Sequence, residues 1–234
     1  MFVRDLVHES AFAGLRAAGA GDGVVAVERL GLAIATVIQR RGQSRELSAA
    51  VTANFAIDLP VGAEWTANNG VAWLGTGPGK WLAIGEARET EFVGKLKTKL
   101  GEFASVAEQS DGLGVLRLTG PALFRTLEKG VQVDLAPGAF PTGSVAVTVV
   151  AHIGVTLWKV DDQPTVDVAV ARSLCNSFLH WLEASAAPYG RLADKAELSS
   201  AAMRDVLGRK NTSPGIFDEK AIQATARGNR PRPG

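Results

Sequence analysis

Residues 70–85 read GVAWLGTGPGKWLAIG, and this stretch decides the class of fold. Two short apolar segments, 70–75 and 80–85, flank the turn sequence TGPG at 76–79. Glycine and proline between two apolar runs of this length are typical of a β-hairpin, so we expect two antiparallel strands here. Further short apolar strands are expected on both sides of this hairpin, with helical segments between them.

Helical segments flank the hairpin. Ser44 is expected to cap a helix whose buried positions Leu47, Val51 and Phe55 lie four residues apart. A second helix is expected over 88–100, ended by Gly101 in a left-handed conformation. The other expected elements are strands within 24–39, strands at 104–109 and 114–118, a helix from Pro121 to Gly130 after the Gly120 turn, strands at 144–150, 154–160 and 165–170, and a helix over 173–184 that buries Leu174, Cys175, Phe178, Leu179 and Leu182.

This order of hairpins and helices favours an α+β fold with helices packed on antiparallel strands. Three segments are expected: an N-terminal segment, 1–23; an α+β region, 24–190; and a C-terminal extension, 191–234. The extension contains the breaker sequence KNTSPG at 210–215, and isolated apolar residues such as Phe217 follow it. We expect this extension to be either disordered or ordered by a partner.

The composition excludes several functional classes. The chain has 234 residues, of which 46% are hydrophobic, and its 25 basic and 24 acidic side chains give a net charge of +1. A balanced charge provides no global field that would steer nucleic acid to the protein. The single cysteine rules out an intrachain disulfide and, with three histidines, makes an internal zinc site improbable. We find neither a run of about 18 apolar residues nor the apolar core of a signal peptide, so the cytoplasm is the expected location.

The glycine-rich turn at 75–80 superficially resembles a phosphate-binding loop. Such a loop needs an earlier glycine where Leu74 stands, and a serine or threonine where Trp81 stands. A helix should also follow, whereas the sequence predicts a strand. The turn is therefore interpreted as part of the hairpin.

The remaining reactive side chains also have structural interpretations. His8, His152 and His180 are far apart in the sequence, and His152 is expected in a turn between strands. Cys175 is expected on a buried apolar stripe, where a thiol acts as a small hydrophobic group. The adjacent carboxylates at 161–162 are expected in a solvated hairpin turn. No catalytic, cofactor-binding or metal-binding residue is therefore assigned, and no autonomous active site is expected.

Several segments together resemble a known family. The hairpin pieces WLG at 73–75 and WL at 81–82 are similar to the "WLGP…WLL" hairpin of sarcosine oxidase gamma subunits and, more loosely, to the glycine-cleavage T-protein superfamily. The similarity extends to LRLTGP at 116–121, KGVQVDL at 129–135, AFP at 139–141, VDV at 166–168, ARS at 171–173 and WL at 181–182. It covers roughly residues 10–190. The chain departs from the family at Val131, where cysteine is common, and in the residues that follow Gly190.

The resemblance implies a T-protein-like, folate-binding-like arrangement and membership of a complex of four different subunits. Such a complex oxidatively demethylates sarcosine or a related N-methyl amino acid and passes the one-carbon unit to tetrahydrofolate. The resemblance further implies that FAD, FMN, NAD, zinc and tetrahydrofolate are bound by the alpha, beta and delta partner subunits. This chain would then be a non-catalytic gamma subunit, with no nucleic-acid or membrane partner.

Two other functions remain open from the sequence. The chain could act as a folate-binding or aminomethyl-transferring module itself, although no carboxylate in the matched segments has a clear claim to acid–base catalysis. It could also be an assembly factor that shares the fold. Binding of folate to the isolated chain would identify the folate-binding module. An assembly factor would be recognised because the chain would not remain with the flavoprotein during purification.

Overall fold

The computed structural model describes residues 10–12, 15, 23–85 and 91–190. Every described residue belongs to one compact unit, Met1–Glu197. The expected extension at 191–234, most of the expected segment at 1–23 and the start of the helix expected at 88 lie outside the described residues.

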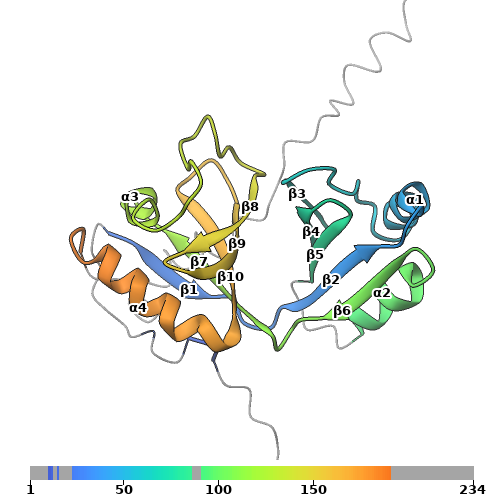
Figure 1. Ribbon diagram of the computed structural model, residues 1–234, viewed down its shortest axis with the longest axis horizontal. Coiled ribbons are helices and arrows are strands. Elements are labelled where there is room, and N and C mark those ends of the chain that lie inside the picture. Colours follow the sequence, from blue (N-terminus) through green and yellow to red (C-terminus); the bar gives the residue numbers. More distant parts are fainter. Residues whose placement is uncertain (1–9, 13–14, 16–22, 86–90, 191–234) are drawn as a thin grey trace, which may run out of the picture. The chain divides into compact units, whose positions relative to one another are not determined.

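The described residues form two five-stranded antiparallel sheets (Figure 1). The first sheet has the order β1-β7-β10-β9-β8, and its strands are β1 (Val25–Glu28), β7 (Leu113–Thr119), β10 (Thr165–Ala171), β9 (Ile153–Lys159) and β8 (Val145–Val150). The second sheet has the order β3-β4-β5-β2-β6, and its strands are β3 (Trp65–Asn68), β4 (Val71–Gly77), β5 (Lys80–Gly85), β2 (Ala33–Gln39) and β6 (Ala104–Glu108).

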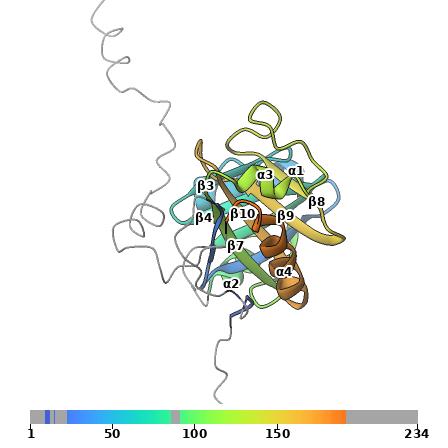
Figure 2. The same ribbon diagram turned by 90° about the vertical axis from the view of Figure 1, so that its left-hand side faces the viewer.

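Each sheet carries helices on one face. Helices α1 (Ser44–Phe55) and α2 (Phe92–Leu100) pack on the second sheet. On the first sheet lie α3 (Leu123–Leu127) and α4 (Cys175–Ala186), the latter preceded by a 3₁₀ turn, η1 (Arg172–Leu174). Figure 2 shows α3 and α4 in front of the strands that they cover. The α+β class predicted from the sequence is confirmed.

Three apolar clusters account for this arrangement of layers. One cluster joins α3 and α4 to the first sheet, and includes Phe178 and Leu116. A second joins α1 and α2 to the second sheet, and includes Leu47 and Trp73. The third lies between the two sheets and is formed mainly by strand residues that point away from the helices. It consists of Leu32, Ile34, Leu74, Leu82, Ile84, Val115, Val145, Trp158 and Ala169. Strands buried on both faces explain why β5 and β10 are almost continuously apolar.

The hairpin quoted from residues 70–85 forms as predicted, with β4 paired to β5. A β-bulge lies between Gly75 and Gly77, and Gly79 supplies a positive φ of 64° in the turn. The hairpin lies inside a β2-α1-β4-β5-α2-β6 sequence, which is the split β-α-β arrangement.

The start of β3, with the segment before it, ties the two sheets together at one corner. The Val145 amide donates to the Ala63 carbonyl at 2.8 Å, and the Trp65 amide donates to the Gly143 carbonyl at 2.8 Å. The indole Nε1 of Trp65 also donates to the Lys159 carbonyl at 2.8 Å. Strand β3 was not predicted from the sequence, because its residues, WTAN, show no apolar alternation.

Several local predictions were wrong. The cap of α1 is Gln43 rather than Ser44, and it makes no side-chain capping bond. Gly101 has φ −61°, so it is not left-handed; glycine is needed because a Cβ there would lie 2.5 Å from the Lys97 carbonyl oxygen. Leu174 is 39% exposed, because it lies in the 3₁₀ turn before α4 rather than on its buried stripe.

The predicted Gly120 turn is confirmed. Gly120 has φ +116°, and a Cβ there would lie 2.4 Å from the Gly23 carbonyl oxygen. Helix α3 is shorter than the helix predicted over 121–130, because it begins at Leu123 and ends at Leu127. None of the helices in the described ranges is long and apolar enough to cross a membrane.

Candidate functional site

A buried ion cluster is the principal polar constellation of the described residues. The Asp167 side chain is completely buried on β10, and its two carboxylate oxygens accept hydrogen bonds from two arginines. Arg117 donates from Nε to Oδ1 at 2.7 Å and from a terminal nitrogen to Oδ2 at 2.8 Å. Arg29 donates to Oδ2 at 2.7 Å. The side chains of both arginines are about four-fifths buried.

The strand register positions this cluster. Asp167 lies directly opposite Arg117 in the β10–β7 pairing, and directly opposite Trp158 in the β10–β9 pairing. Arg29 follows β1, where its amide donates to the Val115 carbonyl at 2.9 Å. Asp167 has the same strand parity as Ala169, which belongs to the cluster between the sheets. The carboxylate therefore faces the second sheet rather than α3 and α4.

This geometry is suited to holding strands rather than to reacting with a substrate. A two-point arginine–carboxylate contact fixes the orientation of both groups, and charge-assisted bonds of 2.7–2.8 Å are strong. Burial of a charged group is tolerated because the group is paired and hydrogen-bonded. The cluster joins three segments that are far apart in the sequence: the end of β1, β7 and β10.

This cluster was not predicted from the sequence. Two of its members lie inside segments quoted for the family resemblance, namely Arg117 in LRLTGP and Asp167 in VDV. Asp167 alternates with the valines of its expected strand, so the sequence placed it on the outward face, where a charged side chain is ordinary. Arg29 carries no signal either, because it follows a short strand in a turn.

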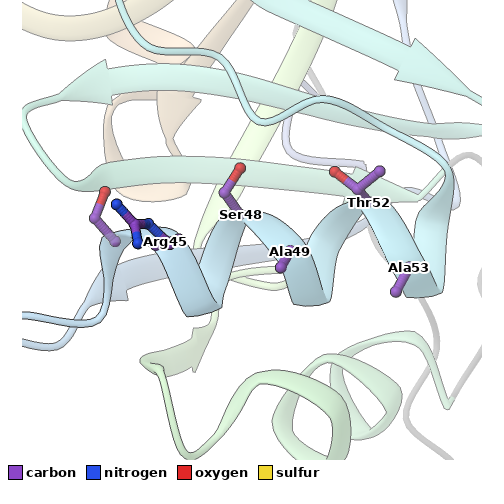
Figure 3. Close-up of a pocket in the computed structure, with 6 residues that line it drawn as sticks. Arg45, Ser48, Ala49, Thr52 and Ala53 are labelled. Carbon is purple, nitrogen blue, oxygen red and sulfur yellow. The ribbon is translucent and has the colours of Figure 1, made fainter.

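A pocket of about 840 Å³ lies against α1 (Figure 3). The described residues that line it come from this one helix, and apart from Arg45 they are small. Figure 3 shows them in a row along one side of the helix. They are Ser44, Arg45, Ser48, Ala49, Thr52 and Ala53. These side chains include no general base or nucleophile activated by a neighbouring group, so they form no recognisable catalytic set.

The rejected candidates lie apart from one another. His152 has φ +70° and is exposed in the turn between β8 and β9, whereas His180 is exposed on α4. His8 lies outside the described residues. Asp161 and Asp162 lie in the turn between β9 and β10, where Asp162 accepts a hydrogen bond from the Thr142 hydroxyl at 2.7 Å. No group of three metal-binding side chains occurs in the part of the chain that the structure describes.

Two buried groups have shifted pKa values. Burial raises the pKa of the Cys175 thiol to about 11, so the group is a neutral thiol at ordinary pH. The prediction that Cys175 is a buried apolar residue is confirmed. Burial also lowers the pKa of the Lys159 ammonium, an effect that Asp161 and Asp162 oppose. The Lys159 ammonium donates hydrogen bonds to the carbonyls of Asp161 and Gln163, and these bonds stabilise the turn between β9 and β10.

The described part of the chain is a pair of antiparallel sheets flanked by helices, and solved structures share this fold. The chain is similar to a chain of the heterotetrameric sarcosine oxidase from Corynebacterium sp. U-96, with 26% identity and a TM-score of 0.69 over 78% of this chain and 96% of that chain. A likeness in fold alone relates it to the glycine cleavage system aminomethyltransferase T from Bartonella henselae, with 9% identity and a TM-score of 0.50 over 68% of this chain and 45% of that one.

Sequence comparison identifies the family. The model of the sarcosine oxidase gamma subunit family matches residues 41–188, and the chain belongs to this family. It is 36% identical to the sarcosine oxidase subunit gamma of Arthrobacter sp. over 118 residues, which are 49% of this chain and 58% of that relative. It is 31% identical to the same subunit of Corynebacterium sp. strain U-96 over 57% of this chain and 66% of that relative. The matched regions thus span 55–66% of the curated relatives.

Proposed function

We propose that this chain is the gamma subunit of a heterotetrameric sarcosine oxidase-like complex and that it serves there as a structural subunit without an active site of its own. The observation that carries the proposal is the similarity to a chain of the heterotetrameric sarcosine oxidase, which covers 96% of that chain. The family membership supports it. The polar cluster around Asp167 supports it too, because all three of its side chains are engaged with one another.

In this proposal the partners are the alpha, beta and delta subunits. The complex oxidatively demethylates sarcosine or a related N-methyl amino acid in the cytoplasm, with tetrahydrofolate as the one-carbon acceptor. FAD, FMN, NAD, zinc and tetrahydrofolate are bound by the partner subunits. The gamma subunit holds the folate-binding part of the large subunit in place.

The isolated chain tests the assignment of chemistry to the partners. We expect recombinant chain, purified by gel filtration, to show no flavin absorbance, no bound zinc and no oxidation of sarcosine. A titration with tetrahydrofolate, followed by intrinsic tryptophan fluorescence, should show no saturable change. Saturable binding of folate at micromolar concentration would instead support the alternative that this chain is itself an aminomethyltransferase-like module. The likeness in fold to the aminomethyltransferase is the observation that favours this alternative.

The proposal extends to residues 191–234, which lie outside the described residues. Their nine basic and five acidic side chains, with the apolar Ile216, Phe217 and Ile222, suit contact with a partner that offers apolar pockets and acidic residues at the rim. Limited proteolysis should cut this segment rapidly in the free chain and slowly in the complex. Equal cleavage in both, or full retention of the subunit after truncation at Gly190, would contradict this part of the proposal.

A further inference from the structure

The positive charge of the chain is unevenly distributed. Residues 1–190 carry 16 basic and 19 acidic side chains. Within them, the loop and helix at 40–55 and the helical segment at 91–102 hold six basic and three acidic side chains. The rest of residues 1–190 therefore holds ten basic and sixteen acidic side chains. The described residues outside these two segments hold seven basic and eleven acidic side chains, so the segments that contain α1 and α2 are basic and the rest of the described chain is acidic.

Five of these cations gather where α1 begins and α2 ends. The Arg40 amide donates to the Phe103 carbonyl at 2.8 Å, and Arg40 Nε donates to the Gly101 carbonyl at 3.2 Å. These bonds hold the start of α1 beside the end of α2, and Figure 1 shows the two helices side by side. We define the basic corner as the exposed residues Arg40, Arg41, Arg45, Lys97 and Lys99.

The described part of the chain does not neutralise the basic corner. Within the described ranges, none of its five members forms an ion pair with a carboxylate. Lys97 and Lys99 lie in the last turn of α2, where the helix dipole favours cations. Arg45 lies in the first turn of α1, where the dipole disfavours a cation, and Glu46 beside it compensates only in part. The described part of the chain therefore offers these arginines no carboxylate as an ion-pair partner.

We propose that the basic corner docks an acidic segment of a partner polypeptide in the complex, and this inference rests on the proposed function. The charge of the corner is complementary to such a segment, and complementary charges guide association and fix the relative orientation of partners. Ser44 and Arg45 line one end of the pocket along α1, so an extended segment bound at the corner can continue beside the small side chains that line the rest of it.

A polypeptide fits the corner better than a polyanion. Glu46 and Glu102 are exposed beside the corner in sequence and would repel a phosphate backbone, whereas a partner polypeptide can present basic side chains to them. Residues 40–46 and 97–102 also contain no aromatic side chain on which a base could stack.

Charge reversal in the reconstituted complex tests the inference. The dissociation constant between this chain and the remaining subunits is measured at low and at high salt for the wild type, for the double variant Arg41→Glu/Arg45→Glu and for Lys97→Glu/Lys99→Glu. Lys80→Glu, which reverses an exposed cation on β5, is the control. Each free variant is first shown by circular dichroism to melt as the wild type does.

We expect both double variants to bind at least about tenfold more weakly at low salt and to lose much of the salt dependence, because exposed charges are screened by salt. The control should bind within about twofold of the wild type. Unchanged affinity and salt dependence in both double variants would overturn the inference alone. Failure of the wild-type chain to bind the other subunits would instead contradict the proposed function.

A second arm distinguishes the source of the negative charge. The isolated chain is passed over heparin and mixed with vesicles that contain phosphatidylserine. We expect the wild-type chain to bind heparin and these vesicles weakly, and we expect the double variants to weaken this binding only to the extent that their lower net charge accounts for. Tight binding to either polyanion that the double variants abolish, with assembly unaffected, would overturn the assignment to a polypeptide.

Discussion

The substitution Asp167→Asn removes the central charge of the buried ion cluster and keeps the size of the side chain. The carboxylate that it replaces accepts three hydrogen bonds from Arg29 and Arg117, and it is fully buried. Removing one partner of a buried ion pair typically costs about 3–5 kcal/mol, because charge is left in a poorly solvated position. The exposed fifth of each arginine side chain limits the cost to the lower part of that range.

The expected loss can be measured by denaturant unfolding of the free chain and by its melting temperature. For a domain of this size, about 1 kcal/mol corresponds to roughly 2–4 °C, so the variant should melt about 6–15 °C lower. Asp58→Asn, an exposed carboxylate, is the matched control and should change the free energy of unfolding by less than about 0.5 kcal/mol. A loss at Asp167 no greater than that of the control would refute the view that this cluster holds β1, β7 and β10 together.

Three further predictions concern single positions. Gly120→Val should lower the free energy of unfolding by roughly 1–3 kcal/mol, because φ is +116° and a Cβ would lie 2.4 Å from the Gly23 carbonyl oxygen. The control Gly138→Val has open space around it and should change this free energy little, and equal melting temperatures of the two variants would count against this reasoning. Phe12→Ala should cost about 3–5 kcal/mol in denaturant unfolding, since Phe12 is 1% exposed in the core; a loss below 1 kcal/mol would show that the segment is not docked there. Iodoacetamide should modify Cys175 much more slowly in the folded chain than in urea at pH 8, because the pKa of the thiol is raised to about 11, and rapid alkylation of the folded chain would contradict its burial. The raised pKa also means that the contribution of this thiol to stability is present below pH 9 and is lost as the pH rises toward 11.

Features that depend on neighbouring residues were predictable from the sequence. The hairpin at 70–85 has its signal in the turn sequence and the two apolar runs beside it. The buried faces of α1 and α2 were predictable because apolar residues recur at helical spacing. The glycine at position 120 was recognised because a strand, a turn and a helix meet at it.

Features that depend on distant parts of the chain were not predictable. The pairing of Asp167 with Arg117 requires the register of two strands that are 50 residues apart, and Arg29 lies 138 residues from Asp167. Gly114 faces Cys175 and Phe12, so its lack of a side chain reflects packing from both ends of the described chain. A single sequence contains no signal for such meetings, because each residue taken alone has an ordinary local interpretation.

We propose that this chain is a stoichiometric subunit of a four-subunit flavoenzyme complex. The most direct test is native mass spectrometry of the material that co-purifies with an affinity tag on this chain, after co-expression with the flavoprotein genes of the same source. The account predicts one assembly of four different chains that contains this chain once and carries bound flavin. Recovery of this chain alone, or of a flavin-containing assembly that lacks it, would contradict the account.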